Sequence, residues 1–580
     1  LEIRGTTYVP DGEGVMSPTY AQQHAPVLKQ KEAVGHAVRA TYLYAGMADV
    51  GTLTANPAYA RALGRIWGNI TDKKMHITGG LGAVHGIEGF GPNYELPNAH
   101  AFNETCAAVG NVLFNYRMFL LHKDARYLDV AEVALLNNVL AAVNFEGNRF
   151  FYVNPLAADG KYPFNHGTAG RAPWFGTACC PSNLARVIPQ VPGMTYAHDD
   201  ANFYVTFFAE STTTVQMGGV QVAIGQKTAY PNNGEIRLLI KPKKPSKFRL
   251  HLRIPTWTGE RFIPGKLYSY LDQSTQSFTL SVNGQPVEVP VTKGFVFIER
   301  IWKAGDRVAL NLPMPVRVSR SHEAVKANTG RIALTRGPFV LCAEGIDNGG
   351  VTQRYFFDHL PKVAAARTKT TTIDSGSFIQ VSLSAKTVTK TGGTQASRLI
   401  LTPYYAWNNR GNGSMTVWFP RDKALSVYDP HALPKESIFA GIKASHTSPL
   451  DTVSAIGDGK EPRFSSGKKV PRWTSRPQKG KPQWVEARFH RARQVRSIGV
   501  YWMQDRQEVM FPKEWSLEVL QGGKWKPFKL YTTDRYDHRA NQYNVVHPAA
   551  PLKCEAIRIR MTPKEDACVG ILEVQVAFEK

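Results

Sequence analysis

The sequence predicts a multidomain protein in which a helical N-terminal region is followed by β-sandwich domains. Residues 19–192 carry apolar side chains at helical spacing, separated by Gly-rich connections. Near Asp199 the composition changes to short runs rich in β-branched and aromatic residues. Such runs resume after a stretch rich in Gly, Pro, Ser and Lys at residues 455–483. A length of 580 residues fits about three domains of common size.

The helical region alternates helix pairs with long loops, which favours a toroid of helices. Pro57 lies where the first turn of a helix is expected, a position that tolerates proline. The expected helices span residues 30–47, 57–70, 104–121, 127–143 and 183–188.

The β region is punctuated by turn signals such as Asn283-Gly284. It is expected to form one or two sandwiches, followed by a linker or long surface loop and a last compact β domain. The predicted boundaries are 1–195 for the C-terminal part of the helical barrel, 196–440 for the β-sandwich region, 441–483 for the linker and 484–580 for the final sandwich.

Composition and charge narrow the possible partners. No run of about 18 apolar residues occurs, so no membrane span is predicted. The formal net charge is +24, yet no nucleic-acid-binding motif accompanies it, so no nucleic-acid partner is predicted. The charge is interpreted either as a solvated basic surface or as an attraction to acidic glycan.

Six cysteines in this length do not form a disulfide framework. Cys554 and Cys568 lie near the end of the chain and could meet in one domain, bridged or free.

Two short segments combine cysteines with a carboxylate. Cys179 and Cys180 are adjacent, and a vicinal pair reaches disulfide geometry only with strain. Together with Glu104 and Cys106 they provide three thiolates and one carboxylate, enough for a tetrahedral zinc site. The alternatives are a reactive or redox-active thiolate and buried cysteines that act as small hydrophobes.

A Gly- and aromatic-rich loop at residues 85–98 contains two candidate carboxylates. Partial burial of Glu88 would raise its pKa and suit it to general acid catalysis. Glu95 competes for this role, and either residue could instead be a solvated loop carboxylate.

Three further residues are candidate site residues. His36 lies in a helical segment next to Gly35, and its alternative is a satisfied core histidine. Tyr152 could hold a sugar hydroxyl or only pack. Glu132 interrupts an apolar helical run as either a cleft residue or a salt-bridge partner.

The ordered set of these motifs resembles glycoside hydrolase family 127, the β-L-arabinofuranosidases built on an (α/α)6 barrel followed by β-sandwiches. The resemblance covers roughly residues 15–420. It rests on the segments 76–82, 88–90, 94–98, 104–108 and 179–183.

The resemblance implies a zinc ion held by Glu104, Cys106, Cys179 and Cys180. It implies that Cys179 is the nucleophile and Glu88 the general acid/base, so that two displacements give retention of configuration. His36 and Tyr152, and more weakly Glu132, would line the sugar pocket.

Two departures from the family pattern bear on these expectations. The family's barrel normally begins well before the point where this chain starts, so about half of the toroid and its pocket histidines are expected to be missing. Ile87 stands where many relatives carry a smaller or polar residue, which affects the substrate more than the chemistry.

The end of the chain resembles a discoidin-type (coagulation factor 5/8 C-type) β-sandwich, a domain type that often binds carbohydrate. The motifs that carry this resemblance occupy residues 484–489, 495–502, 512–519, 525–527 and 570–576.

The sequence thus predicts a retaining exo-glycoside hydrolase that releases β-L-arabinofuranose from plant oligosaccharides or polysaccharides. The alternatives are a hydrolase of another rare pectic sugar and a non-catalytic, zinc-stabilised carbohydrate-binding protein. A periplasmic or secreted location is predicted, with the cytoplasm as the alternative; oligomeric state is not predicted.

Overall fold

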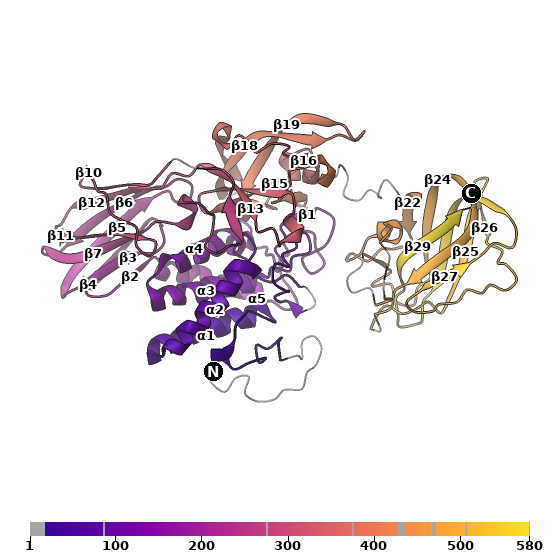
Figure 1. Cartoon of the computed structure of the whole chain (residues 1–580), viewed down its shortest axis with the longest axis horizontal. Helices are drawn as coiled ribbons and strands as arrows, with labels where there is room; N and C mark the ends of the chain where they lie inside the picture. Colours follow the sequence, from indigo (N-terminus) through magenta and orange to yellow (C-terminus); the bar gives the residue numbers. More distant parts are fainter. Residues whose placement is uncertain are drawn as a thin grey trace. The chain divides into compact units, whose positions relative to one another are not determined.

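The protein is described from a computed structural model that covers residues 18–84, 87–273, 276–373, 376–426, 428, 437–460, 462, 464–466, 471–505 and 507–578. His85 and Gly86 of the predicted acid/base loop lie outside these residues. The chain divides into an N-terminal unit, residues 1–428, and a C-terminal unit, residues 429–580 (Figure 1). None of the described helices is both long and apolar enough to cross a membrane.

The N-terminal unit begins with the helices. They are α1 (Ala37–Thr54), α2 (Pro57–Asn69), α3 (Thr105–His122), α4 (Ala125–Val133) and α5 (Cys179–Val187). α2 and α4 continue as π-helical segments, η3 (Ile70–Lys74) and η5 (Ala134–Val139). The short helix η6 (Ile188–Met194) follows α5.

Helix ends follow the chemistry of the capping residues. Asn56 accepts from the Ala58 amide at the start of α2, and Asp124 accepts from the Arg126 amide at the start of α4. α1 starts seven residues later than the sequence predicted, at Ala37 rather than at residue 30. Gly35 explains the delay, because it has φ +70° and a Cβ there would lie 2.2 Å from the Thr19 carbonyl oxygen.

α5 corrects a second expectation. The predicted helix began at residue 183 and left the cysteine pair in a loop, whereas α5 begins at Cys179. Pro181 lies in the first turn, where a proline leaves no helical hydrogen bond unmade. Both adjacent cysteines therefore belong to the first turn of a helix.

Two sheets follow the helices and contribute to the same core as they do. One has the strand order β11-β7-β3-β2, and the other β10-β9-β12-β6-β5-β4. Neighbouring strands are antiparallel except for β3 and β7, which are parallel. The strands are β2 (Tyr196–His198), β3 (Asn202–Val205), β4 (Ser211–Met217), β5 (Val220–Thr228), β6 (Glu235–Pro242), β7 (Ser246–Arg253), β9 (Thr279–Val282), β10 (Gln285–Pro286), β11 (Phe295–Trp302) and β12 (Asp306–Asn311).

A larger antiparallel sheet completes the N-terminal unit, with the main order β16-β18-β19-β15-β14-β13-β8. β1 and β20 extend it from β15, β17 pairs with β18, and β21 pairs with β14. The strands are β1 (Ala157–Asp159), β8 (Tyr268–Tyr270), β13 (Val316–Ser321), β14 (Arg331–Arg336), β15 (Phe339–Glu344), β16 (Tyr355–Phe356), β17 (Arg367–Ile373), β18 (Gly376–Val388), β19 (Thr394–Pro403), β20 (Ser414–Thr416) and β21 (Phe419–Pro420).

The C-terminal unit is an antiparallel β-sandwich with the order β23-β29-β24-β28-β25-β26, and β22 and β27 also pair with β24. The strands are β22 (Phe439–Ala444), β23 (Trp473–Thr474), β24 (Gln483–Trp502), β25 (Glu514–Gln521), β26 (Lys524–Pro527), β27 (Tyr543–Val546), β28 (Leu552–Thr562) and β29 (Gly570–Phe578). Cys554 and Cys568 are both free.

The structure differs from the predicted linker at 441–483. β22 pairs with β24, and Trp473 of β23 is fully buried in the core of the sandwich. The stretch is polar on average, but a few of its apolar residues, such as Ile456 and Trp473, pack in the core of the domain. The final sandwich therefore begins before the predicted residue 484.

The fold class is the predicted one at a coarse level: helices first, then β-sandwich domains (Figure 1). That the helices form part of an (α/α)6 toroid stays a prediction.

Candidate active site and metal centre

Glu104, Cys106, Cys179 and Cys180 meet in the interior of the N-terminal unit. One ligand atom from each lies within 4.8 Å of all the others. The Cys106 and Cys180 sulfurs are 3.3 Å apart, and the Cys179 and Cys180 sulfurs 3.9 Å apart. The Glu104 Oε1 atom is 3.7 Å from the Cys179 sulfur and 3.8 Å from the Cys180 sulfur.

Two helix starts bring these side chains together. Glu104 is the residue before α3, where it forms an isolated β-bridge with Val153. Cys106 is the second residue of α3, two positions after Glu104, so the two side chains leave the chain close together. Cys179 and Cys180 open α5, whose exposed amide groups carry partial positive charge that favours thiolates.

The pKa values of the four groups shift in different directions. Hydrogen bonds with Cys106 and Cys180 lower the pKa of Cys179 to about 2. The hydrogen bond with Cys179 raises the pKa of Cys106, and burial raises the pKa of Cys180 and of Glu104. One thiolate is thus favoured, while burial makes further negative charge costly without a cation.

The donor set fits a soft divalent metal ion. Three sulfurs and one carboxylate suit tetrahedral zinc, whereas magnesium and calcium prefer shells of oxygen ligands. The second carboxylate oxygen, Oε2 of Glu104, is buried and has no hydrogen-bond partner. A cation beside these donors would compensate the charge that the protein itself leaves unpaired.

A second group shares Glu104. His36, Glu88 and Glu104 each present an atom within 4.8 Å of the others. The His36 Nε2 atom lies 3.2 Å from a Glu88 carboxylate oxygen. Glu88 therefore lies next to the cysteine cluster, at a position where its side chain retains about a third of its exposure.

The backbone around Glu88 holds it in this place. Glu88 has φ +48°, an uncommon value for a residue with a side chain. Its carbonyl accepts from the Ala37 amide at the start of α1. Gly89 packs so closely that a Cβ there would lie 2.2 Å from the Gly35 carbonyl oxygen. Glu95, the competing carboxylate of the same loop, is exposed.

Tyr152 completes the group around Cys179. Its hydroxyl lies 3.3 Å from the Cys179 sulfur and can donate to a thiolate there. Burial raises the pKa of Tyr152, so the phenol keeps its proton. The His166 ring lies against the Tyr152 ring, with 4.3 Å between centroids, and Phe175 packs edge-on at 5.6 Å.

Glu132 belongs to a different cluster. It is buried on α4, and both of its carboxylate oxygens accept from the Arg253 guanidinium of β7. Asp129 accepts from the same guanidinium at 2.7 Å. Of the two interpretations made from sequence, the structure favours the salt-bridge partner, and Glu132 belongs to neither of the two groups that contain Glu104.

Sequence reasoning missed the residues that surround the cluster. His166, Phe175 and Tyr42 carry no local signal, because only the fold places them near Tyr152 or α5. Asn183 is different: it lies four residues after Cys179 on α5, so one helical turn puts both on one face. Its side-chain amide donates to the Cys106 sulfur at 2.9 Å.

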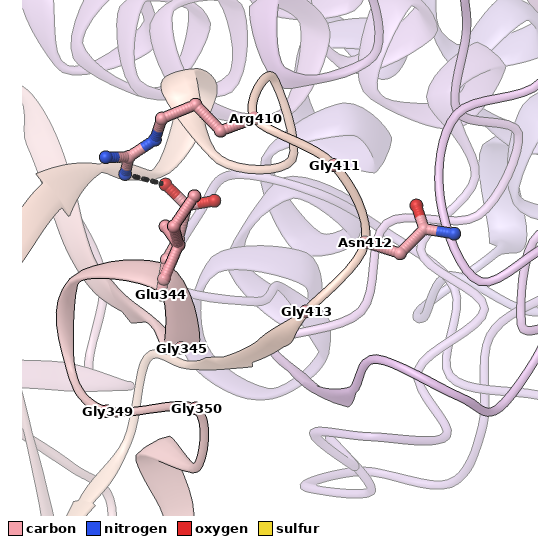
Figure 2. A pocket seen from close by; sticks show the side chains of 9 residues that line it. Glu344, Gly345, Gly349, Gly350, Arg410, Gly411, Asn412 and Gly413 are labelled. Atoms are coloured by element: carbon pink, nitrogen blue, oxygen red, sulfur yellow. Dashed lines mark hydrogen bonds and ion pairs between the residues drawn. The ribbon is translucent and has the colours of Figure 1, made fainter.

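A separate hollow lies elsewhere in this unit. Its volume is about 390 Å³, and it is lined by residues 344–346, 349–350 and 410–413 (Figure 2). There Arg410 donates to Glu344 and to Asp347, so the charged groups of the hollow satisfy one another. It contains none of the predicted site residues.

Comparisons with known proteins agree with the order of the domains. Residues 5–193 match the family model described as "Beta-L-arabinofuranosidase, GH127 catalytic domain". Residues 202–314 match the GH127 middle domain, and residues 316–420 the glycoside hydrolase family 127 C-terminal domain. Residues 442–574 match the F5/8 type C domain.

One curated relative is the "Non-reducing end beta-L-arabinofuranosidase" of Bifidobacterium longum subsp. longum, 32% identical over 427 residues. The match covers 70% of this chain and 62% of the relative, so the chain spans less than two thirds of that protein's length.

Solved structures show the same relation. A GH127 β-arabinofuranosidase is 43% identical with a TM-score of 0.68, covering 73% of this chain and 65% of its own. A GH127 β-L-arabinofuranosidase from Geobacillus stearothermophilus T6 is 34% identical, with a TM-score of 0.65 and coverage of 72% and 65%. A structure titled "Glycoside hydrolase" is 32% identical, with a TM-score of 0.64 and coverage of 72% and 70%.

Proposed function

Because the chain belongs to glycoside hydrolase family 127, we propose that it is a retaining exo-glycosidase that releases β-L-arabinofuranose from plant glycans. The observation that carries the proposal is the cluster of Glu104, Cys106, Cys179 and Cys180, with Glu88 beside it. The family match supplies the class of reaction, and the geometry supplies groups that can perform it.

In this proposal the four clustered residues hold zinc. When bound, the metal keeps the thiols deprotonated and compensates their charge in the protein interior. These residues fit zinc because their ligand atoms, three sulfurs and a carboxylate oxygen, lie within 4.8 Å of one another. In addition, the Oε2 atom of Glu104 has no hydrogen-bond partner.

The first step belongs to Cys179 and Glu88. The Cys179 sulfur attacks the anomeric carbon of the sugar, and the bond from that carbon to the leaving oxygen breaks. Glu88, starting protonated, gives its proton to the leaving oxygen, so that the aglycone departs as an alcohol. The product is a glycosyl thioether on Cys179.

The second step reverses these roles. The Glu88 carboxylate takes a proton from water while the water oxygen attacks the anomeric carbon and the carbon–sulfur bond breaks. Cys179 returns as a thiolate, and Glu88 regains its proton. Two inversions at one carbon give net retention.

His36 and Tyr152 are assigned to positioning. His36 lies 3.2 Å from Glu88 and Tyr152 3.3 Å from Cys179, so each contacts a reacting group. The Tyr152 oxygen can also accept a hydrogen bond from a sugar hydroxyl. Glu132 is left out of the proposed sugar pocket, because Arg253 occupies both of its carboxylate oxygens.

The remaining expectations stay part of the proposal. The helices would belong to an (α/α)6 toroid, and the C-terminal unit would bind carbohydrate. A periplasmic or secreted location suits a protein that acts on plant oligosaccharides or polysaccharides. The charge of +24 would also suit an acidic pectic sugar as substrate.

The test combines metal analysis with turnover, using the full-length gene product. We expect about one zinc per chain and release of p-nitrophenol from p-nitrophenyl β-L-arabinofuranoside, with retained configuration in the early product. Zinc without release would favour the carbohydrate-binding alternative. Absence of both would refute the proposal.

A further inference from the structure

Asn183 connects the cysteine cluster to a polar network outside it. It lies on α5 one turn after the adjacent cysteines, and its Nδ2 atom donates to the Cys106 sulfur at 2.9 Å. The helix that provides Cys179 and Cys180 thus also reaches the cysteine of α3.

Two donors fix the orientation of this amide. The Tyr42 hydroxyl, from α1, lies 3.1 Å from the Asn183 Oδ1 atom, and the Arg186 guanidinium donates to the same oxygen. Arg186 also donates to the Tyr42 hydroxyl at 2.6 Å. With its oxygen held by two donors, the amide can only turn its N–H groups toward the sulfur.

We propose that Asn183 is a positioning residue of the metal centre, which holds the Cys106 thiolate in its ligating direction. This inference rests on the proposed metal site. An N–H···S hydrogen bond occupies one lone pair of the sulfur and restricts the rotation of the Cys106 side chain. The Cys106 sulfur is then held beside the Cys180 sulfur, 3.3 Å away, and within 4.8 Å of the Glu104 carboxylate.

The network also addresses charge. Three thiolates and a carboxylate carry more negative charge than a divalent cation neutralises. Arg186, which is exposed, lies one turn after Asn183 and polarises the amide that donates to Cys106. The positive charge of Arg186 thus strengthens the hydrogen bond that the neutral Asn183 side chain donates to the Cys106 sulfur. Outer-shell partners tune metal ligands in this way.

The contacts of Asn183 are those of a positioning residue. Among the described residues, the hydrogen bonds of its side chain join Tyr42, Cys106 and Arg186. A residue that merely stabilised α5 would instead bond backbone groups of its own helix, as the neighbouring Ser182 does with Ala178 and Cys179.

The experiment compares zinc affinity in Asn183→Leu, Asn183→Asp and the control Ser182→Ala. Leu removes all three hydrogen bonds, whereas Asp keeps an acceptor for Tyr42 and Arg186 but loses the N–H. Competition against a chromophoric zinc chelator gives the affinity. We expect both Asn183 variants to bind zinc about 10–100-fold more weakly, and Ser182→Ala to match the wild type.

Cobalt substitution provides a readout that a purely structural role would not change. The sulfur-to-cobalt charge-transfer bands report thiolate ligation directly, and we expect them to shift in both Asn183 variants. Circular dichroism of the metal-free proteins establishes that each variant is folded.

Each outcome decides the matter. Wild-type affinity and an unchanged cobalt spectrum in a folded Asn183→Asp would overturn the inference and leave the proposed function intact. Weaker zinc binding by both Asn183 variants, combined with a wild-type protein that binds zinc but lacks hydrolase activity, would support the inference and refute the proposed function. A wild-type protein without metal affinity would refute both.

Discussion

Two clusters in the N-terminal unit bury carboxylates, and they handle the charge in opposite ways. Around Arg253, the carboxylates of Asp129 and Glu132 meet a guanidinium, and all three groups are almost fully buried. At the cysteine cluster, Glu104 is equally buried, but its Oε2 atom has no hydrogen-bond partner and its Oε1 atom lies beside the Cys179 and Cys180 sulfurs.

The difference separates a structural charge cluster from a reactive one. Although burial opposes it, the charges of Glu132 and Asp129 raise the pKa of Arg253, so this cluster is complete within the protein. Burial raises the pKa of Glu104, and the charges of Cys179 and Glu88 raise it further, whereas Arg253 opposes the effect of burial on the pKa of Asp129. An incomplete cluster of this kind marks the place where a metal ion and a substrate are expected.

The largest expected effect tests whether the cysteine cluster is reactive at all. Cys179→Ser should lower kcat on p-nitrophenyl β-L-arabinofuranoside by a factor on the order of 10⁴ or more, because the nucleophile is lost. Activity assays and zinc analysis measure it. The control is Cys342→Ala, which removes a buried thiol outside the cluster and should leave turnover close to wild type. Turnover retained in Cys179→Ser would place the nucleophile elsewhere.

The next effect concerns the carboxylate beside the cluster. Glu88→Gln should slow hydrolysis by about 10²–10⁴-fold, since it removes the general acid/base. The loss in the first step should be larger for an alkyl arabinofuranoside than for the p-nitrophenyl substrate, whose leaving group needs little protonation. Glu95→Gln changes the exposed carboxylate of the same loop and serves as the matched control. Equal losses in the two Gln variants would contradict the assignment.

The third prediction concerns the complete cluster, where stability rather than catalysis should suffer. Glu132→Gln leaves the buried Arg253 with a single carboxylate and should reduce the free energy of unfolding by about 3–5 kcal/mol. Chemical denaturation measures it. Glu235→Gln breaks an exposed ion pair with Arg237 and should cost less than about 1 kcal/mol. If Glu132→Gln were as mild as this control, the Arg253 cluster would not be the structural one.

The smallest effect is a pH dependence of the metal-free protein. Because the folded state raises the pKa of Glu104 above its ordinary value of 4.5, the folded protein holds that proton more tightly than the unfolded chain. The resulting stabilisation is fully present below about pH 4.5 and is lost as the pH rises through the folded-state pKa.

Glu104→Gln is neutral at every pH and should lack this contribution. Urea midpoints measured against pH in excess chelator should fall less steeply for the variant than for the wild type. Parallel curves would show that Glu104 is compensated after all.

Local sequence was sufficient for the pieces of the cysteine cluster. Glu104 and Cys106 lie two residues apart, and Cys179 and Cys180 are adjacent, so each pair is near in space whatever the fold. Local sequence was also sufficient for the change from helices to strands near Asp199, because a run of a few β-branched and aromatic residues is enough to predict a strand. The linker at 441–483 was wrong because a few buried apolar residues in a polar stretch outweigh its average composition.

The choice between alternatives depended on distant partners. Glu132 was a cleft residue or a salt-bridge partner until Arg253, 121 positions away, was placed beside it. The spacing of Asn183 from Cys179 placed both on one helix face, but its three contacts come from α1, α3 and the next turn of α5 and could not be predicted. No window of sequence contains both members of such pairs.

The sequence by itself determined which reactive groups are present, namely the soft metal ligands and a loop carboxylate. It also determined the order of the helical and β domains. What only the tertiary structure decided is which charges are compensated and which are not. Residue types and short spacings follow from the covalent chain, whereas compensation of a buried charge depends on groups within a few ångströms, and folding alone brings those together.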